Sequence, residues 1–211
     1  MSDLTAYALN CSLKPSPAPS SCGLLLDQVL AELATHGVKG SMDRVVDHDV
    51  KPGVTSDEGG GDAWPDLRAK VLAADIFILG SPIWLGHPSS LAQRVLERMD
   101  AFLGETDDRG RMVSYGRVAG VAVVGNEDGA HHVTAQLYQG LADVGFTIPA
   151  NGVTYWVGRA MQTTDYNDLD ETPKETARAT AMMARNVAHL ARLLKSNGYP
   201  GDPDAEFEKD K

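Results

Sequence analysis

Hydroxyl-bearing residues surround the start of the first predicted helix. Ser20, Ser21 and Cys22 follow a segment with three prolines, and that segment follows an apolar stretch at residues 4–9 that predicts a strand. A serine at the start of a helix can cap it, and the unpaired N–H groups there bind anions such as phosphate. Ser12 and Lys14 would add a hydroxyl and a positive charge. The residues alone fit either an ordinary helix cap or a phosphate site.

A second candidate region follows the central strand. Residues 76–79 read Ile-Phe-Ile-Leu, and such an unbroken apolar run predicts a strand covered on both faces, as in a parallel sheet flanked by helices. Gly80-Ser81-Pro82 predicts the end of this strand, and Trp84 lies in the apolar loop that follows. Because open α/β sheets bind ligands beyond the carboxyl ends of their strands, Trp84 is expected to line a ligand site, with plain core packing as the alternative.

The remaining elements must bring these two regions together. Strands are expected at residues 4–9, 42–48, 76–79 and 118–124, with a last strand region at 146–148 and 153–157; helices are expected at 20–35, 66–74, about 90–103, 131–144 and 173–195. Strand and helix thus alternate five times, and short connections of this kind are right-handed and parallel. The predicted fold class is α/β: a three-layer sandwich with a five-stranded parallel sheet in the order 2-1-3-4-5 and helices on both faces. In this order the loops 10–22, 81–88 and 125–131 leave the same edge.

Composition narrows the class of protein. The net charge of −10 and the absence of a Lys/Arg stripe exclude a nucleic-acid partner. No apolar run approaches the length of about 18 residues that a membrane span needs, and no secretory signal opens the chain, so no membrane partner and a cytoplasmic location are expected. We expect one domain at residues 1–195 and an acidic, disordered tail at 196–211. Residues 51–62 are expected to be a loop, made too flexible for regular structure by three consecutive glycines.

Several common site types are missing. The chain has no G-x-G-x-x-G after a strand, no G-x-x-x-x-G-K-[ST] and no G-x-S-x-G, so a dinucleotide-binding Rossmann domain, a P-loop and a hydrolase elbow are not supported. Ser81-Pro82 stands where a phospho-acceptor domain needs an acid. His131 and His132 lack ligand partners at metal-binding spacing, so no metal site is predicted. Cys11 and Cys22 are expected to be small buried residues, with a redox pair as the alternative.

Three segments resemble the flavodoxin-like NAD(P)H-dependent FMN reductase family. They are Ser20-Ser21 at the helix start, IFILGSPIWLGHPSSLAQRVLERM after Asp75, and VAVVGNEDGAHH; the resemblance covers about residues 4–195. It implies a flavodoxin-like fold, FMN as cofactor, NADPH or NADH as electron donor, and a homodimer or homotetramer. The family's usual Gly-Ser-Pro-Arg start is replaced here by residues 10–14, Asn-Cys-Ser-Leu-Lys. The cysteines that many relatives carry after the second strand are absent, which argues against an iron–sulfur form.

The resemblance also implies the cofactor-binding residues. The FMN phosphate would be held by Ser12, Ser20, Ser21 and Cys22, beside Lys14. The isoalloxazine and the ribityl chain would be lined by Pro82, Ile83, Trp84, Leu85 and Gly86, and the other edge closed by Asn126, Glu127, Asp128, Gly129 and His131. Glu127 and Asp128 could instead cap the next helix. No catalytic side chain is predicted, because flavin itself accepts hydride and passes electrons onward.

These features favour an FMN-dependent oxidoreductase that takes hydride from NAD(P)H and reduces a small-molecule electron acceptor, such as a quinone, a nitro compound, a free flavin or an azo dye. The alternatives are an electron carrier that does not react with nicotinamide and a flavin-free binding module on the same fold. Tyr155 and Trp156 could belong to the core, a dimer surface or the substrate pocket. The acidic residues 161–172 are expected to form a solvated excursion or a lid over a neighbouring subunit's flavin.

Overall fold

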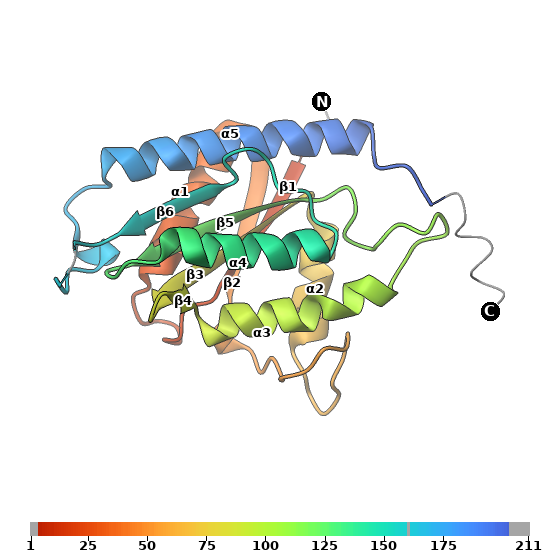
Figure 1. Cartoon of the computed structure of the whole chain (residues 1–211), viewed down its shortest axis with the longest axis horizontal. Helices are drawn as coiled ribbons and strands as arrows, with labels where there is room; N and C mark the ends of the chain where they lie inside the picture. The colour runs from red at the N-terminus through yellow and green to blue at the C-terminus, as the bar shows by residue number, and fades with distance from the viewer. Residues whose placement is uncertain (1–3, 160, 203–211) are drawn as a thin grey trace.

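The computed structural model describes residues 4–159 and 161–202 (Figure 1). Its parallel sheet contains β1 (Leu4–Asn10), β2 (Val38–Arg44), β3 (Ile76–Trp84), β5 (Val118–Gly125) and β6 (Val153–Val157). The strand order is β2-β1-β3-β5-β6, which confirms the predicted order 2-1-3-4-5. One short strand, β4 (His87–Pro88), was not predicted and pairs antiparallel with the end of β3.

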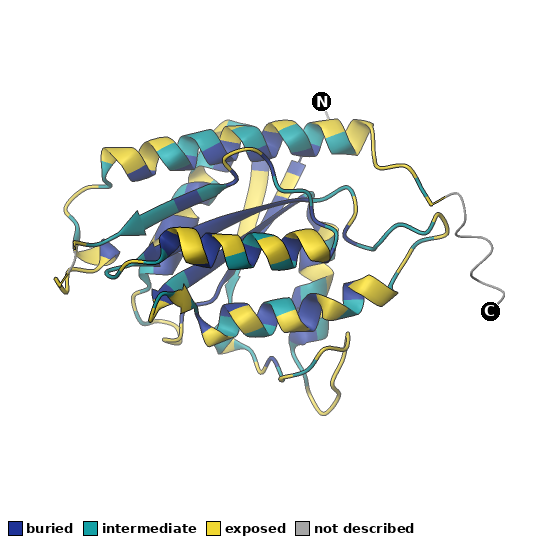
Figure 2. Ribbon diagram, viewed as in Figure 1, coloured by how far each residue is buried: buried dark blue, intermediate teal, exposed yellow. Residues whose placement is uncertain are grey.

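Helices cover both faces of the sheet. On one face, α1 (Ser21–Thr35) packs against α5 (Lys174–Ser196), and their apolar residues form one buried cluster with the sheet. On the other face, α2 (Trp64–Ala73), α3 (Ser90–Met99) and α4 (Ala130–Asp143) enclose a second cluster. Figure 2 shows the buried strands between helices whose outer faces are exposed. The predicted three-layer sandwich is therefore confirmed.

The local signals explain where the main elements begin. The run at residues 76–79 is completely buried, because helices cover both faces of β3. Ser20 caps α1 by accepting a hydrogen bond from the Gly23 N–H at 3.0 Å, and Ser89 caps α3 by accepting one from the Ala92 N–H at 3.1 Å. The loop that precedes each of these two helices therefore lies at the carboxyl edge of the sheet.

Strand ends were predicted less well than strand cores. The second strand occupies Val38–Arg44 instead of 42–48, and Val45–Asp47 forms a 3-10 helix. β2 is an edge strand with a mostly polar sequence, so its backbone pairing with β1 sets its position rather than an apolar pattern. β3 continues through Gly80-Ser81-Pro82 to Trp84, because these residues pair with Ala122–Val124 of β5. Of the last strand region, only Val153–Val157 forms a strand, while Thr147 makes an isolated bridge to Val118.

Helix ends differ from the predicted ones by more than one residue in two places. α2 begins at Trp64, with Pro65 in its first turn, rather than at residue 66. α3 ends at Met99 and continues as a 3-10 helix at Asp100–Gly104. The change of helical period leaves Phe102 buried but turns Leu103 outward, where 47% of it is exposed.

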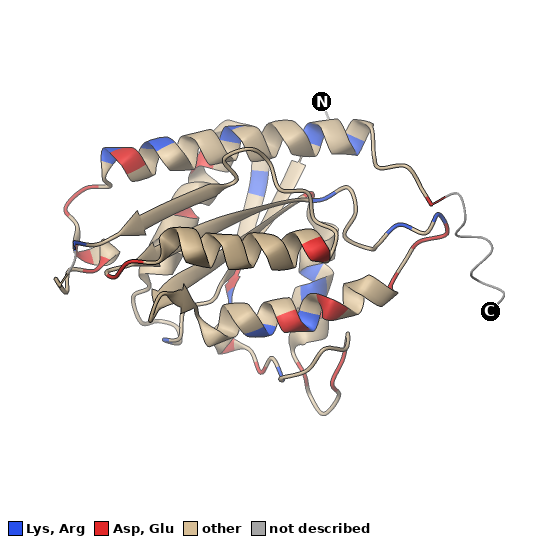
Figure 3. Cartoon of the chain, in the orientation of Figure 1, with Lys and Arg blue, Asp and Glu red and all other residues tan. Residues whose placement is uncertain are grey.

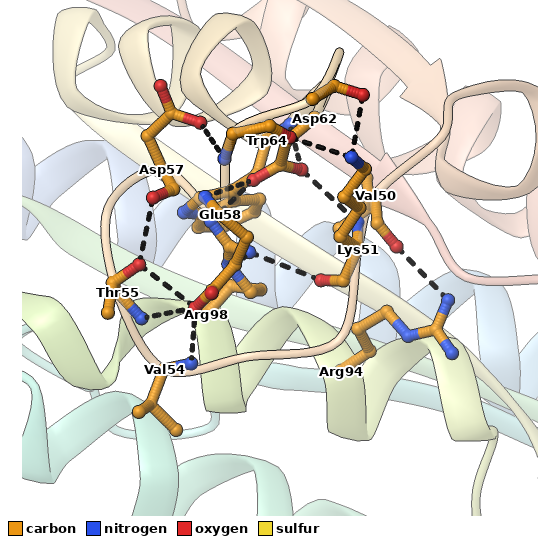
Figure 4. A network of polar contacts seen from close by, with 12 residues as sticks. Val50, Lys51, Val54, Thr55, Asp57, Glu58, Asp62, Trp64, Arg94 and Arg98 are labelled. Carbon is orange, nitrogen blue, oxygen red and sulfur yellow. Dashed lines mark hydrogen bonds and ion pairs between the residues drawn. The ribbon is translucent and has the colours of Figure 1, made fainter.

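The loop at residues 51–62 is organised by a buried ion pair (Figure 4). The Arg98 side chain on α3 is fully buried and lies 2.7 Å from the Asp62 carboxylate. Asp62 also accepts backbone hydrogen bonds from Lys51, Glu58 and Trp64 at 3.0–3.1 Å. The Lys51 ammonium donates to the carbonyl oxygens of Gly59 and Gly60 at 2.7 and 2.6 Å. The loop has no regular secondary structure, as predicted, but polar contacts fix its path.

The carboxyl-terminal part of the chain extends past α5. Tyr199 packs against Tyr115, with ring centroids 5.4 Å apart, and its hydroxyl lies 2.8 Å from the Thr147 hydroxyl. Residues 203–211, most of the predicted acidic tail, lie outside the described residues, and the division into a domain at 1–195 and a tail stays a prediction. Within residues 4–159 and 161–202, no helix has the length and apolar character needed to cross a membrane.

Candidate functional site

A cavity of about 370 Å³ opens at the carboxyl edge of the sheet, left in Figure 1, where β1, β3 and β5 end. The segment between β6 and α5 forms another of its walls. Nine of the predicted site residues line it: Ser12, Lys14, Ser20, Ser21, Cys22, Pro82, Ile83, Trp84 and Asn126. The strand order therefore brings together the two regions that the sequence marked out.

A larger hollow, of about 630 Å³, lies elsewhere, between residues 107–117 and the end of α5. Its cationic side chains already have partners. Arg111 pairs with Asp107 at 2.6 Å, Lys195 pairs with Asp75 at 2.9 Å, and Arg117 donates to carbonyl oxygens of its neighbours. We place the functional site at the carboxyl edge, where polar groups remain without partners.

The start of α1 offers several unused hydrogen-bond donors. Among the described residues, the buried Ser12 hydroxyl has no hydrogen-bond partner, and the N–H groups of Ser21 and Cys22 have none either. The Ser20 hydroxyl already has two partners, because it accepts hydrogen bonds from the Gly23 N–H and, at 3.3 Å, from the Asn10 side-chain amide. A hydroxyl and two helix N–H groups that meet at a helix N-terminus form a seat for an anion.

Hydrogen bonds from β2 and from the 3-10 helix that follows it hold the proline-containing loop beside this seat in place. Arg44 donates to the carbonyl oxygens of Lys14 and Ala18 at 3.1 and 2.8 Å. The Asp47 carboxylate accepts from the Ser16 hydroxyl and N–H at 2.6 and 2.8 Å, and these hydrogen bonds hold the pKa of Asp47 below its ordinary value. The path of the loop is thus fixed before any ligand binds.

The two cysteines are buried and free, beside this seat. Burial raises the pKa of Cys22 to about 12, although the Cys11 N–H and the Arg44 charge act in the opposite direction. Burial also raises the pKa of Cys11 well above its usual range, and the neighbouring Cys22 adds to the effect. Both thiols therefore stay protonated at neutral pH, which favours small buried residues over a reactive pair.

Trp84 forms an aromatic wall of the cavity. It is the last residue of β3, and 52% of it is exposed, so its ring is available to a ligand. The next residue, Leu85, has a φ of 52° and donates its N–H to the Glu127 carboxylate at 2.8 Å. A Cβ at Gly129 would lie 2.8 Å from the Gly86 Cα, so only glycine allows the two loops to approach this closely. Glu127 and Gly129 thus fix the turn that follows Trp84.

The other six predicted site residues, which we call the rim residues, do not line the cavity: Leu85, Gly86, Glu127, Asp128, Gly129 and His131. No side chain caps the start of α4, so Glu127 and Asp128 do not act as its N-cap in the described chain. His131 faces Tyr155, with 3.1 Å between its Nε2 and the tyrosine hydroxyl. Contact between these rim residues and a flavin stays a prediction.

The sequence missed one wall of the cavity. The lining residues outside the prediction are Leu13, Pro19, Val124, Gly125, Trp156, Asp165, Tyr166, Asn167 and Asp168. Of the three alternatives for Tyr155 and Trp156 (the core, a dimer surface or the substrate pocket), the structure favours the pocket for Trp156, because Trp156 lines the cavity. Tyr166 lies in the acidic segment but is only 2% exposed, so the expectation of a fully solvated excursion is wrong there. A tyrosine within an acidic segment was the one sequence signal that could have indicated this contact.

No group of three or more His, Cys, Asp and Glu side chains suited to a metal ion occurs in the part of the chain that the structure describes. The cavity instead combines an anion seat, an aromatic wall and apolar strand ends. This combination fits a phosphorylated aromatic ligand.

The sequence profile of the NADPH-dependent FMN reductase family matches residues 5–162, about three quarters of the chain. The chain belongs to this family. It is therefore an oxidoreductase enzyme with flavin-related chemistry and FMN as its cofactor, as the sequence resemblance implied. The unpartnered donors at the start of α1 fit the phosphate of this cofactor.

Two matches, one of sequence and one of structure, extend over nearly the whole chain. The 8-demethyl-8-aminoriboflavin-5'-phosphate synthase of Streptomyces davaonensis is 31% identical over 212 residues, which cover 96% of this chain and 82% of the synthase. A crystal structure of RosB with a bound intermediate, 8-demethyl-8-formylriboflavin-5'-phosphate, has a TM-score of 0.87 and 30% identity, and the match covers 98% of this chain and 86% of that one.

Other matches say less about activity. The divalent metal cation transporter MntH of Mycobacterium bovis is 36% identical over 200 residues, but this chain spans only 29% of that protein's length. A flavodoxin-like WrbA-like protein from Agrobacterium tumefaciens has a TM-score of 0.59 at 16% identity, over 90% of this chain and 98% of that one, which supports the fold alone.

Proposed function

We propose that the protein takes hydride from NADPH or NADH onto bound FMN and passes the electrons to a small acceptor such as a quinone, a nitro compound or a free flavin. The observation that carries the proposal is the unpartnered buried Ser12 hydroxyl beside the free N–H groups of α1, in a cavity that Trp84 also lines. The cavity thus offers hydrogen-bond donors to a phosphate and an aromatic side chain to a flat ring.

The residues of this chain bind and orient the cofactor. Ser12, Lys14 and the N–H groups of Ser21 and Cys22 would hold the phosphate, while Pro82, Ile83 and Trp84 would lie against the ring system. The flavin, when bound, accepts hydride and delivers electrons. No side chain needs to act as an acid or a base, so we assign no catalytic residue.

A second candidate is that a flavin phosphate is the substrate. The relative from Streptomyces davaonensis is named as a synthase of an aminoriboflavin phosphate, and the RosB crystal structure holds a formylriboflavin phosphate intermediate. Both similarities extend over nearly all of this chain. A flavin-modifying reaction would use the same phosphate seat and the same aromatic wall.

The location and assembly of the protein are part of the proposal. We propose a cytoplasmic homodimer or homotetramer, on the ground of the family resemblance. The exposed Trp84 and the 89% exposed Leu85 beside the cavity support an apolar contact at its mouth. The alternative of an electron carrier that does not react with nicotinamide is separated from the reductase by the experiment below.

The test is anaerobic titration of the FMN-loaded protein with NADPH and then NADH, followed by the visible absorbance of the flavin. Bleaching by either nucleotide, and recovery on adding a quinone, is the result expected of the reductase. Saturable FMN binding without bleaching would favour the electron carrier, and no FMN binding would overturn the proposal. Mass spectrometry of the flavin after aerobic incubation would reveal a change of mass if the flavin is a substrate.

Replacing Trp84 by alanine is expected to weaken FMN binding by about 5-fold to 30-fold, because stacking on an aromatic side chain contributes roughly 1–2 kcal/mol. The side chain is half exposed, so thermal unfolding of the flavin-free protein should change little. Trp84→Phe should retain most of the affinity. The measurement is quenching of FMN fluorescence, with Leu103→Ala as the control for loss of an exposed apolar side chain away from the cavity. An unchanged affinity in Trp84→Ala would remove this residue from the site.

A further inference from the structure

The turn before α5 crosses the start of α1. This turn, residues 165–168, contains the 3-10 helix η3 (Tyr166–Asp168) and its N-cap residue, Asp165. We call it the η3 turn. The Asn167 N–H donates a hydrogen bond to the Ser21 hydroxyl at 3.4 Å. The side chains of the η3 turn line the same cavity as Ser12, Ser20 and Ser21. The turn is thus a wall of the cavity next to the anion seat.

Contacts with three elements hold the η3 turn in place. Tyr166 is buried; its hydroxyl donates to the Gln28 amide oxygen on α1 at 2.7 Å, and its ring lies 5.3 Å from the ring of Trp156 on β6. The Asn126 amide, just after β5, donates to the Asp165 carboxylate at 2.9 Å. The Asp168 carboxylate accepts the Asp165 N–H at 3.0 Å, which closes a capping box. The two carboxylates are therefore placed by the fold.

The two walls differ in chemistry. The α1 wall presents hydroxyl and N–H donors, whereas Asp165 and Asp168 present carboxylates, which accept hydrogen bonds and repel anions. Lys14 is the single cationic side chain among the described residues that line the cavity. Figure 3 shows the acidic residues gathered on the segment between β6 and α5. One phosphate can be held at the α1 wall, but a second phosphate would meet two carboxylates and no further cation.

We propose that Asp165 and Asp168 make this cavity selective for a flavin with one terminal phosphate over the dinucleotide FAD. The hydroxyl groups of a ribityl chain can donate to these carboxylates, while the second phosphate and the nucleoside of FAD would have to pass them. The inference rests on the proposed FMN site, and it assigns a specificity role to residues outside the segments that carry the family resemblance.

The test compares the dissociation constants of FMN, FAD and riboflavin for five proteins, by flavin fluorescence at low and high salt. The proteins are the native chain, Asp165→Asn, Asp168→Asn, the double variant with both changes, and the control Asp170→Asn. Asparagine keeps an oxygen that accepts the Asn126 and backbone hydrogen bonds and removes only the charge. Asp170 lies on the same segment but does not line the cavity, so it matches the change in net charge.

Each cavity variant is expected to bind FAD about fivefold more tightly, the size of a like-charge repulsion in a largely solvated site. FMN affinity should change less, so the ratio of FAD to FMN dissociation constants should fall. High salt should reduce this ratio in the native protein and in Asp170→Asn, but not in the double variant Asp165→Asn/Asp168→Asn.

Equal ratios in all five proteins would overturn the proposal, provided that FMN still binds. Failure of the native protein to bind FMN would instead remove the proposed function, so the two failures are distinguishable. If the charge variants unfold at a lower temperature than Asp170→Asn, the salt dependence of the native protein alone decides. A ratio that salt leaves unchanged would then count against a role for the carboxylates.

Discussion

Replacing Arg98 by leucine is expected to lower the free energy of unfolding by about 3 kcal/mol, because it leaves a buried carboxylate without its counter-ion. The Arg98 and Asp62 side chains are both fully excluded from solvent and lie 2.7 Å apart. Leucine restores part of the volume but donates no hydrogen bond to the Lys51 carbonyl, which Arg98 reaches at 3.2 Å. Asp62 would keep its three backbone donors, so the effect should lie at the lower end of the range for buried pairs.

The measurement is urea unfolding of the flavin-free protein, followed by circular dichroism. Arg94→Leu is the matched control, since Arg94 lies one turn earlier on α3 and makes a single hydrogen bond to the Val50 carbonyl, at 3.1 Å. We expect the control to cost about 1 kcal/mol, the usual value of one hydrogen bond. Adding Asp62→Asn to Arg98→Leu should recover part of the loss. Equal effects of the two arginine substitutions would show that the ion pair has no special weight.

The Arg98 effect should also depend on pH. Burial alone would raise the pKa of Asp62, but the backbone N–H groups and the Arg98 charge together lower it below its ordinary value. A lowered pKa in the folded state stabilises the native protein at pH values above the ordinary pKa of about 4, and this stabilisation is lost as the pH falls through the folded value. In Arg98→Leu the carboxyl group can protonate more readily. The stability difference between the two proteins should therefore shrink as the pH falls from 7 towards 3.

The strand order and most of the helix starts could be predicted, because their signals are local. The apolar run at residues 76–79 identifies a doubly covered strand, and Ser20 and Ser89 mark helix starts through bonds to residues three positions away. β2 was misplaced because its sequence is polar and its pairing with β1 decides where it lies. Arg98 illustrates the same limit, since nothing in a charged residue on an amphipathic helix indicates that it is buried.

The site could be predicted where it depends on topology. Once the strand order is known, the loops after β1, β3 and β5 must meet at one edge, and nine predicted residues do line one cavity. The η3 turn could not be found in this way. Its position depends on the contact between Tyr166 and Gln28, which are 138 residues apart in the sequence and share no motif. The wall that we propose to select the cofactor is therefore the part of the site that required the folded structure.

The turn after Trp84 shows how the predicted loops support one another. Leu85 adopts a positive φ, which is unfavourable for a branched side chain, and the Glu127 carboxylate holds its N–H in that conformation. The contact of Gly129 with Gly86 joins the same two loops. Rim residues that do not line the cavity thus determine the orientation of the aromatic wall that does.

Replacing Ser12 by alanine is expected to weaken FMN binding by about tenfold to a hundredfold, since a hydrogen bond to a charged group contributes about 1.5–3 kcal/mol. The Ser12 hydroxyl is buried and lacks a partner among the described residues. Its removal should leave the stability of the flavin-free protein unchanged or raise it by up to about 1 kcal/mol, because a buried hydroxyl without a partner is destabilising. Loss of cofactor affinity without loss of stability is the signature of a group kept for a ligand.

Two comparisons make the Ser12 result specific for phosphate. Riboflavin has no phosphate, so its affinity should be the same for the native protein and for Ser12→Ala. Ser20→Ala should behave differently, because the Ser20 hydroxyl caps α1 and its loss should cost about 1 kcal/mol of stability in addition to any effect on FMN. If Ser12→Ala weakened FMN and riboflavin equally, the phosphate would have to lie elsewhere, and the start of α1 would be only a capped helix. A loss confined to FMN would place the phosphate at the junction of β1 and α1, next to the carboxylates of the η3 turn.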